Sequence, residues 1–198
     1  MVFLGWNNDE EDEIYSASDL IEKFDLSGIN KSGSKFNLDK LNWINSQHIQ
    51  TKNNNELVDY ISNDFNVDSL LADKILTLIK PRLEKLSGLK DGFLYLIENP
   101  SIDGALIDKF SNETSIKLLE IAIEFIRKTS FNSSSEIKEF LFNEMKSREL
   151  RASKVMPVLR VGLVGKLEGP DLFDLMVFLD KNTVLSRFEA FASQLTKS

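Results

Sequence analysis

The chain has 198 residues, with no cysteine, one histidine, and 31 acidic against 24 basic residues, which gives a net charge of -7. Without cysteine there is no disulfide or thiolate metal site, and the longest early apolar run, Met1–Leu4, is too short for a signal peptide or a membrane span, so we expect a cytoplasmic protein. The negative charge argues against a nucleic-acid partner, but the first 30 residues hold eight acids and one lysine, so the rest of the chain is neutral overall.

Apolar residues recur at spacings of three and four through most of the sequence, and period-two alternation is nearly absent. This pattern predicts an all-α protein. The first clear helix is expected to begin after Asn37, whose side chain suits a helix cap, and to place Leu41, Ile44 and His48 on one face. His48 is therefore expected to be a packed or partly exposed helix residue and not a catalytic group.

Further helices are expected after residue 55. A short helix is predicted over residues 56–63, and Asn66 is the expected cap of the next one. Pro81 should end that helix, because the residue before a proline is pushed out of helical geometry, and should open another as its first residue. Arg82 would then lie at a helix start beside a bend, within a tract from Lys74 to Lys90 that holds five basic residues and one acid.

The region after the Asn99-Pro100 break is also expected to be mainly helical. The predicted elements are an apolar helix at 114–128, a helix after the capping-box pair Ser133 and Glu136, the segment 153–164, a helix from Pro170 to Leu179, and a last helix with Leu185, Phe188, Ala192 and Leu195 on one side. A second tract, Lys146 to Lys166, holds six basic residues and one acid. Breaks near 49–54 and 99–101 divide the chain into three expected units, 1–50, 51–100 and 101–198.

No constellation for catalysis is found in the sequence. With one histidine and no cysteine, the chain lacks the residues to form a His-based metal site or a Cys-His nucleophile pair. The glycines are scattered, and Gly162-Leu-Val-Gly165-Lys lacks the spacing of a phosphate-binding loop. The acidic run Asp9 to Glu13 lacks the alternating oxygen ligands and glycine turn of a cation site, so we interpret it as a solvated loop. The residues therefore indicate no active site, cofactor or metal.

Two stretches resemble one known family. The first contains Leu4-Gly-Trp, the acidic run, and Ser34-Lys-Phe-Asn-Leu-Asp-Lys-Leu-Asn-Trp, and it resembles the segment after the KMSKS loop of bacterial glutamyl-tRNA synthetases. The second, Pro157-Val-Leu-Arg-Val-Gly-Leu-Val-Gly-Lys-Leu-Glu-Gly-Pro-Asp-Leu-Phe, is similar to the family's C-terminal P-L-R-x-A-L-T-G-x-x-x-x-P-x-L-F signature. The resemblance covers essentially the whole chain in the right order. Gly162 and Val164 depart from it, since they replace the usual alanine and threonine.

The resemblance implies that the chain holds tRNA(Glu). The complete enzyme joins glutamate to this tRNA with ATP and magnesium, but the HIGH and KMSKS motifs of its catalytic domain are absent here. The fragment is therefore expected to be inactive alone and to hold no cofactor. Met1 could be a native start or a cloning boundary, and its position inside a family helix favours a cloned fragment. Residues 1–50 would contact the inner corner of the tRNA, and the two helical units would grip the anticodon loop. We expect a monomer that binds neither DNA nor a membrane.

The resemblance also implies contacts to the first anticodon base. In the family these come from the arginine of P-L-R and from residues around the proline before L-F, which match Arg160, Gly169, Pro170 and Leu172. Arg160 offers a rigid donor fork beside apolar neighbours, which suits the exposed edge of an unpaired base. Some relatives carry a hydroxyl residue at the position of Gly169, so only a backbone contact can remain there. The loop before Pro170 is expected to expose amides at a helix start, where they suit an oxygen-rich ligand.

Arg82 matches the second arginine of the family's R-P-R-x-x-x-L segment, which reads the third anticodon base. A guanidinium satisfies the acceptors of cytosine and opposes the donors of guanine, so Arg82 should favour glutamate tRNA over glutamine tRNA by roughly 1–3 kcal/mol. For both arginines the alternative is a solvated charge on a helix surface. Contacts with the RNA backbone are expected from Lys80, Lys85, Arg151, Lys154 and Lys166.

A rival function from another class stays open at this point. A helical module could dock on another protein of a tRNA-charging complex through its apolar surfaces. A gel-shift titration with total tRNA would separate this alternative from RNA binding.

Overall fold

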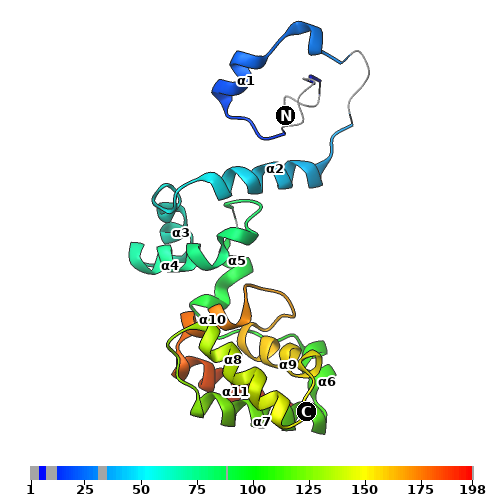
Figure 1. Ribbon diagram of the computed structural model, residues 1–198, viewed down its shortest axis with the longest axis vertical. Helices are drawn as coiled ribbons and strands as arrows, with labels where there is room; N and C mark the ends of the chain where they lie inside the picture. Colours follow the sequence, from blue (N-terminus) through cyan, green and yellow to red (C-terminus); the bar gives the residue numbers. More distant parts are fainter. Residues whose placement is uncertain (1–4, 8–12, 31–34, 88, 198) are drawn as a thin grey trace. The chain divides into compact units, whose positions relative to one another are not determined.

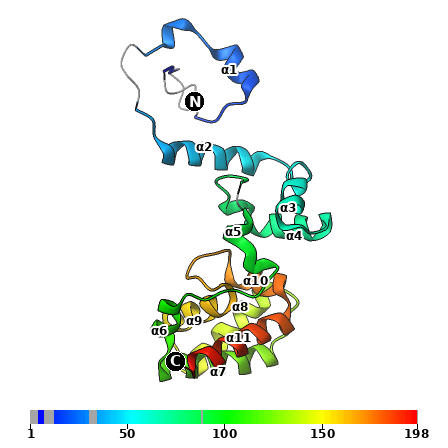
Figure 2. The same cartoon turned by 180° about the vertical axis from the view of Figure 1, so that it is seen from behind.

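The computed structural model describes residues 5–7, 13–30, 35–87 and 89–197. Within these residues every regular element is helical, and the extended pairing is limited to a single bridge between Trp6 and Ile29. The prediction of an all-α protein is therefore confirmed for this part of the chain. The helices gather into two compact units, Met1–Ser87 and Gly88–Ser198, which can be followed by colour in Figures 1 and 2.

The division into units 1–50, 51–100 and 101–198 stays a prediction. The expected boundary at residue 50 falls in the last turn of a helix inside the first compact unit, and the expected boundary at residue 100 falls inside the second.

Near the start of the first unit, Trp6 packs against the backbone and side chains of residues 24–28. The indole Nε1 of Trp6 donates a hydrogen bond to the Asp25 carbonyl at 2.9 Å, the ring lies 5.8 Å from that of Phe24, and the side chain is buried. Gly28 lies against the indole, since a Cβ at this position would come within 2.6 Å of Nε1. The tryptophan of the leucine-glycine-tryptophan motif is thus a structural anchor.

Helix α1 (Ala17–Lys23) and the 3-10 turn η2 (Leu26–Gly28) lie in this part of the first unit, and α2 (Leu38–Thr51) follows. Asn37 caps α2 as predicted, because its side chain accepts a hydrogen bond from the Lys40 amide at 3.0 Å. His48 is half-buried on α2, as expected. Of the predicted acidic loop, Asp9–Asp12 lie outside the described residues, and Glu13 forms an ion pair with Lys40.

The turn η3 (Asn54–Glu56) and the packed pair α3 (Val58–Phe65) and α4 (Ser69–Ile79) complete the core of this unit. The fully buried side chains of the pair are Ile61, Phe65, Ala72, Ile75, Leu76 and Ile79. The predicted cap at Asn66 is wrong: Asn66 ends α3 in the left-handed conformation, with φ 55°, and Asp68 caps α4 by accepting from the Leu71 amide at 2.8 Å. Asparagine tolerates left-handed backbone better than most residues, which suits it to end a helix.

Pro81 does not open a new α-helix, which corrects the prediction made for it. Lys80 keeps the helical angles φ -48° and ψ -42°, and Lys80–Arg82 form the 3-10 turn η4. Leu83 then becomes extended and is 2% exposed. The next helix, α5 (Leu89–Phe93), belongs to the second unit. Burial of Leu83 in the first unit therefore overrides the preference of proline for a helix start.

The second unit is a cluster of packed helices. Its elements are α5, the turn η5 (Leu94–Leu96), α6 (Gly104–Phe110), α7 (Glu113–Lys128), α8 (Ser134–Ser147), α9 (Ala152–Val164), α10 (Leu172–Leu179) and α11 (Lys181–Leu195). Helices α7, α9 and α11 pack against one another, and α10 packs on α8 (Figures 1 and 2). Ser133 caps α8 as predicted, and the apolar helix predicted at 114–128 is present as α7.

Gly162 allows α9 and α11 to approach closely. A Cβ at this position would lie 3.0 Å from a ring carbon of Phe188 and 3.0 Å from one of Phe191, and both rings are fully buried. The glycine that replaces the alanine of the signature thus has a packing reason, because two large rings occupy the space that a methyl group would need.

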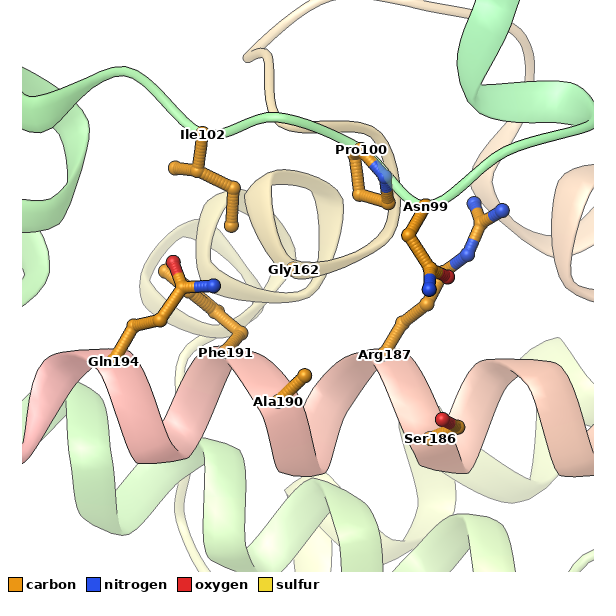
Figure 3. Close-up of a pocket in the computed structure, with 9 residues that line it drawn as sticks. All are labelled: Asn99, Pro100, Ile102, Gly162, Ser186, Arg187, Ala190, Phe191 and Gln194. Carbon is orange, nitrogen blue, oxygen red and sulfur yellow. The ribbon is translucent and has the colours of Figure 1, made fainter.

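Arg187 crosses the interior of the second unit. Its side chain is 5% exposed, and its Nη1 and Nη2 donate hydrogen bonds to the carbonyls of Leu163 and Glu98 at 2.8 and 2.7 Å. Figure 3 shows Arg187 rising from α11 towards the segment that carries Asn99, at the edge of a cavity of about 200 Å³. Burial lowers the pKa of this guanidinium from its ordinary value. Arg187 thus ties the last turn of α9 and the segment after η5 to α11.

Candidate functional site

Arg160 is positioned by the buried backbone of α9. Leu159, Val161 and Leu163 are all 0% exposed, so the core holds the helix on both sides of Arg160, whose own side chain is half-buried. Its Nη1 donates a hydrogen bond to the Pro170 carbonyl at 2.8 Å. Because the guanidinium is a rigid plane, this bond orients its other donors as well.

Two glycines fold the loop after α9 back onto Arg160. Gly165 ends α9 with φ 71°, and a Cβ there would lie 2.3 Å from the Ser101 carbonyl oxygen. Gly169 has φ 151°, which L side chains rarely adopt, and its Cβ position lies 3.4 Å from both Arg160 Nη1 and Tyr95 Oη. The loop therefore brings its backbone beside a guanidinium and a phenol.

Tyr95 is the member of this site that the sequence did not indicate. It lies on η5, its side chain is buried, and its ring packs 6.1 Å from that of Phe93. No motif connects it with Arg160, and only the fold of the second unit brings the two side chains to the same glycine. The candidate site consists of Arg160, Gly169, Pro170 and Tyr95, and we call it the Arg160 site.

Pro170 and Leu172 are both buried, and Leu172 is 3% exposed. The carbonyl of Pro170 already accepts a hydrogen bond from Arg160. The structure thus brings Arg160, Gly169 and Pro170 together as the sequence predicted, while the Leu172 side chain lies in the core. A contact between Leu172 and a ligand stays a prediction.

The predicted helix start at Pro170 is wrong. Helix α10 begins at Leu172, and the Asp171 side chain caps it by accepting hydrogen bonds from the amides of Phe173 and Asp174 at 2.9 and 3.2 Å. Aspartate sets the start because its carboxylate satisfies two free amides at once. These amides therefore already serve a carboxylate of the chain itself, and they do not form the exposed oxygen-binding group that was expected.

Arg82 is exposed at the end of η4 in the first unit. Two hydrogen bonds to α2 and its end lie on either side of it: Lys80 Nζ donates to the Lys52 carbonyl, and Asn45 Nδ2 donates to the Glu84 carbonyl. In the described part of the chain, no hydrogen bond or ion pair engages the Arg82 side chain. The backbone under Arg82 is therefore anchored while the guanidinium is available to a ligand.

The other predicted RNA-contacting residues fall into two groups. Four of them are exposed, namely Lys85, Arg151, Lys154 and Lys166. Lys80 is half-buried, and its ammonium donates to the Lys52 carbonyl and to Asn54 Oδ1. Arg148, from the same basic tract as Arg151, is held by an ion pair with Glu124 at 3.0 Å. The four exposed residues thus remain the better candidates for phosphate contacts.

Two kinds of site are absent from the part of the chain that the structure describes. No group of three or more histidine, aspartate or glutamate side chains there is placed to hold a metal ion. None of the described helices is long and apolar enough to cross a bilayer.

Comparisons with known proteins place this geometry in context. The family model of the anticodon binding domain matches residues 48–192. The glutamate–tRNA ligase of Christiangramia forsetii is 31% identical over 195 residues, which cover 96% of this chain and 39% of the ligase. That of Flavobacterium johnsoniae is 28% identical over 200 residues, covering 98% of this chain and 40% of the ligase. The chain thus spans about two fifths of the length of these relatives.

Two solved structures of glutamate–tRNA ligases also match this chain over about two fifths of their length. A glutamate tRNA ligase from Elizabethkingia meningosepticum, crystallised with its amino acid, matches with a TM-score of 0.81 at 30% identity, over 98% of this chain and 39% of that structure. A glutamate–tRNA synthetase from Elizabethkingia anophelis matches with a TM-score of 0.74 at 28% identity, over 96% of this chain and 38% of that structure.

Proposed function

The chain belongs to the anticodon binding domain family, and from this premise we propose that it binds the anticodon loop of tRNA(Glu) as the C-terminal part of a glutamate–tRNA ligase. The observation that carries the proposal is the Arg160 site. A guanidinium held by a buried helix and oriented by the Pro170 carbonyl lies beside a glycine backbone. Unpaired bases are read by such fixed donors along their exposed edges.

The two arginines would divide the reading between them. Arg160 contacts the first anticodon base, with the backbone of Gly169 and Pro170 beside it, and Arg82 contacts the third base. A guanidinium placed on cytosine meets acceptors, whereas guanine presents donors that oppose it. The exposed Lys85, Arg151, Lys154 and Lys166 add contacts to phosphates, which strengthen binding without selecting a sequence.

The complete ligase would attach glutamate to tRNA(Glu) using ATP and magnesium in the cytoplasm. This chain spans about two fifths of the length of its ligase relatives. We assign no step of the aminoacylation reaction to it, and the role proposed for it is to hold and select the tRNA.

The proposal is tested by titrating the full chain with the anticodon stem-loop of tRNA(Glu). Replacing Arg160 with alanine should weaken binding by about 5- to 150-fold, the range that corresponds to one good base contact of roughly 1–3 kcal/mol. Arg127→Ala is the matched control, because Arg127 lies in the same unit, is 63% exposed and pairs with Glu189. The control should bind like the wild type.

Affinity should also fall as salt rises, because phosphate contacts release counterions. If a well-folded chain ignores the stem-loop at low ionic strength, the proposed function is wrong, and docking on another protein becomes the better explanation. If R160A binds as tightly as wild type across the salt series, the Arg160 site is not where the first base is read.

A further inference from the structure

One face of α8 carries an exposed phenylalanine between two lysines. Lys138, Phe142 and Lys146 are four residues apart, so at 3.6 residues per turn they lie along one side of the helix. All three are exposed, and the Phe142 side chain retains 41% of its accessible surface. We call these three residues the α8 stripe.

The inner edge of the stripe is fixed against α10. The Phe142 ring lies 6.2 Å from the Phe173 ring, tilted by 46°, and Lys138 Nζ lies 6.0 Å from the centroid of the same Phe173 ring. Phe173 is 6% exposed, so it supports Phe142 from below. The outer part of the Phe142 ring is therefore held in place while it remains accessible.

Two residues of the α8 stripe, Lys138 and Phe142, contact the first turn of α10, which follows the Arg160 site in the chain. Phe173 is the second residue of α10 and follows Pro170 by three positions, and the Pro170 carbonyl is the group that Arg160 contacts. Three residues of extended chain span at most about 11 Å. Phe173, and Phe142 at 6.2 Å between the ring centroids, therefore lie within the span of a few unpaired nucleotides from the Pro170 carbonyl.

The charges of the stripe indicate which kind of partner it fits. Neither Lys138 nor Lys146 forms an ion pair with a described residue. Two exposed acids lie near the stripe: Glu139, three residues before Phe142 on α8, and Asp174, which follows Phe173 on α10. Lysine is depleted in the cores of protein interfaces. A platform that combines an aromatic ring with cations suits unpaired bases joined by phosphates, because bases stack on the ring and phosphates attract the lysines.

We propose that the α8 stripe is a stacking platform for an unpaired nucleotide of the RNA loop that binds at Arg160. Phe142 stacks on the base, and Lys138 and Lys146 contact the phosphates on either side of it. This inference rests on the proposed function and extends it to a surface that lies outside the P-L-R and R-P-R segments.

The test uses the full chain and the same anticodon stem-loop. Phe142→Leu keeps an apolar side chain of similar size but removes the ring face, and it should weaken binding by about 5- to 150-fold, as expected for the loss of one stacked base. Phe142→Tyr should restore affinity to within about twofold of wild type. Phe36→Leu is the control, because Phe36 is an exposed phenylalanine of the first unit, at 50% exposure, and the isolated stem-loop lacks the inner corner of the tRNA that residues 1–50 are expected to contact.

The lysines are tested by their salt dependence. The double replacement of Lys138 and Lys146 with glutamine should reduce the slope of log affinity against log salt by about 1.4, since each phosphate contact on a single strand contributes about 0.7. Phe142→Leu should leave that slope unchanged. Glu139→Gln should not reduce the slope, which separates the stripe from a general effect of charge on α8.

The possible results separate the proposed stacking on the α8 stripe from the proposed binding of the anticodon loop. If wild type binds and R160A is weakened while F142L binds like wild type, the stripe is overturned and the proposed function stands. If wild type does not bind, both are overturned. Should F142L unfold, Phe142→Trp replaces it: its added fluorescence, measured against wild type, should be quenched when RNA binds, and unchanged emission overturns the stacking.

Discussion

Replacing Arg187 with methionine should strongly destabilise the second unit. Arg187 donates to two buried carbonyls, those of Leu163 and Glu98. Hydrogen bonds from a charged donor contribute about 1.5–3 kcal/mol each, so their loss removes about 3–6 kcal/mol. Methionine offsets part of this loss, because the variant no longer has to bury a charged group when it folds. We therefore expect a net destabilisation of about 2–4 kcal/mol.

This loss should appear as a selective change in melting. For a unit of this size, about 2–4 kcal/mol corresponds to a fall in Tm of roughly 10–25 °C. Both tryptophans, Trp6 and Trp43, lie in the first unit, so their fluorescence reports on that unit while far-UV circular dichroism reports on both. The dichroism transition should shift in R187M, and the fluorescence transition should stay near its wild-type position.

Two further variants make the prediction sharp. Arg187→Lys keeps the charge but has one compact donor group in place of a fork, so its Tm should lie between those of wild type and R187M. Arg127→Met removes a solvent-exposed arginine and should change the Tm by no more than about 2 °C. A Tm of R187M within about 2 °C of wild type would refute the claim that the two hydrogen bonds of Arg187 stabilise the second unit.

Other predictions concern selection, backbone strain and pH. Arg82→Gln should narrow the preference for C over G at the third anticodon base by about 5- to 150-fold, and equal ratios for variant and wild type in competition binding would count against it. Gly169→Ala should lower stability by about 1–3 kcal/mol in urea unfolding, because alanine is strained at φ 151°; an unchanged midpoint would contradict this. Hydrogen bonds from Lys128 and then Arg148 lower the pKa of Glu124 below its ordinary 4.5, so its stabilising effect should be present above that pH and fade as pH falls through the lowered value; an NMR titration midpoint at or above 4.5 would be inconsistent with these bonds.

Local patterns predicted much of the helical architecture because they depend on near neighbours. The caps at Asn37 and Ser133 followed from side chains that accept a hydrogen bond from an amide three residues on. The apolar period of α7 was long enough to define that helix within one residue. Prediction failed where two signals competed over a few residues, as with Pro170 and the stronger cap Asp171.

Three of the four members of the candidate site were indicated by the sequence, namely Arg160, Gly169 and Pro170. Tyr95 reaches them from a distant turn, and no local pattern encodes that approach. The sequence of the basic tracts also did not show which basic side chains are held by partners within the protein and which stay exposed. Lys80 and Arg148 find partners inside their own units, whereas Lys154 stays exposed, and nothing in the spacing of the charges separates these cases.

The paired attachment of residues 80–84 to α2 has a mechanical consequence. Lys80 holds the carbonyl at the C-terminal end of that helix, where a cation is favoured by the helix dipole, and Asn45 of the same helix holds Glu84. The short turn that carries Arg82 is thereby held against α2 on both sides of Arg82. Moving this turn away from the 14-residue helix α2 would require breaking both hydrogen bonds.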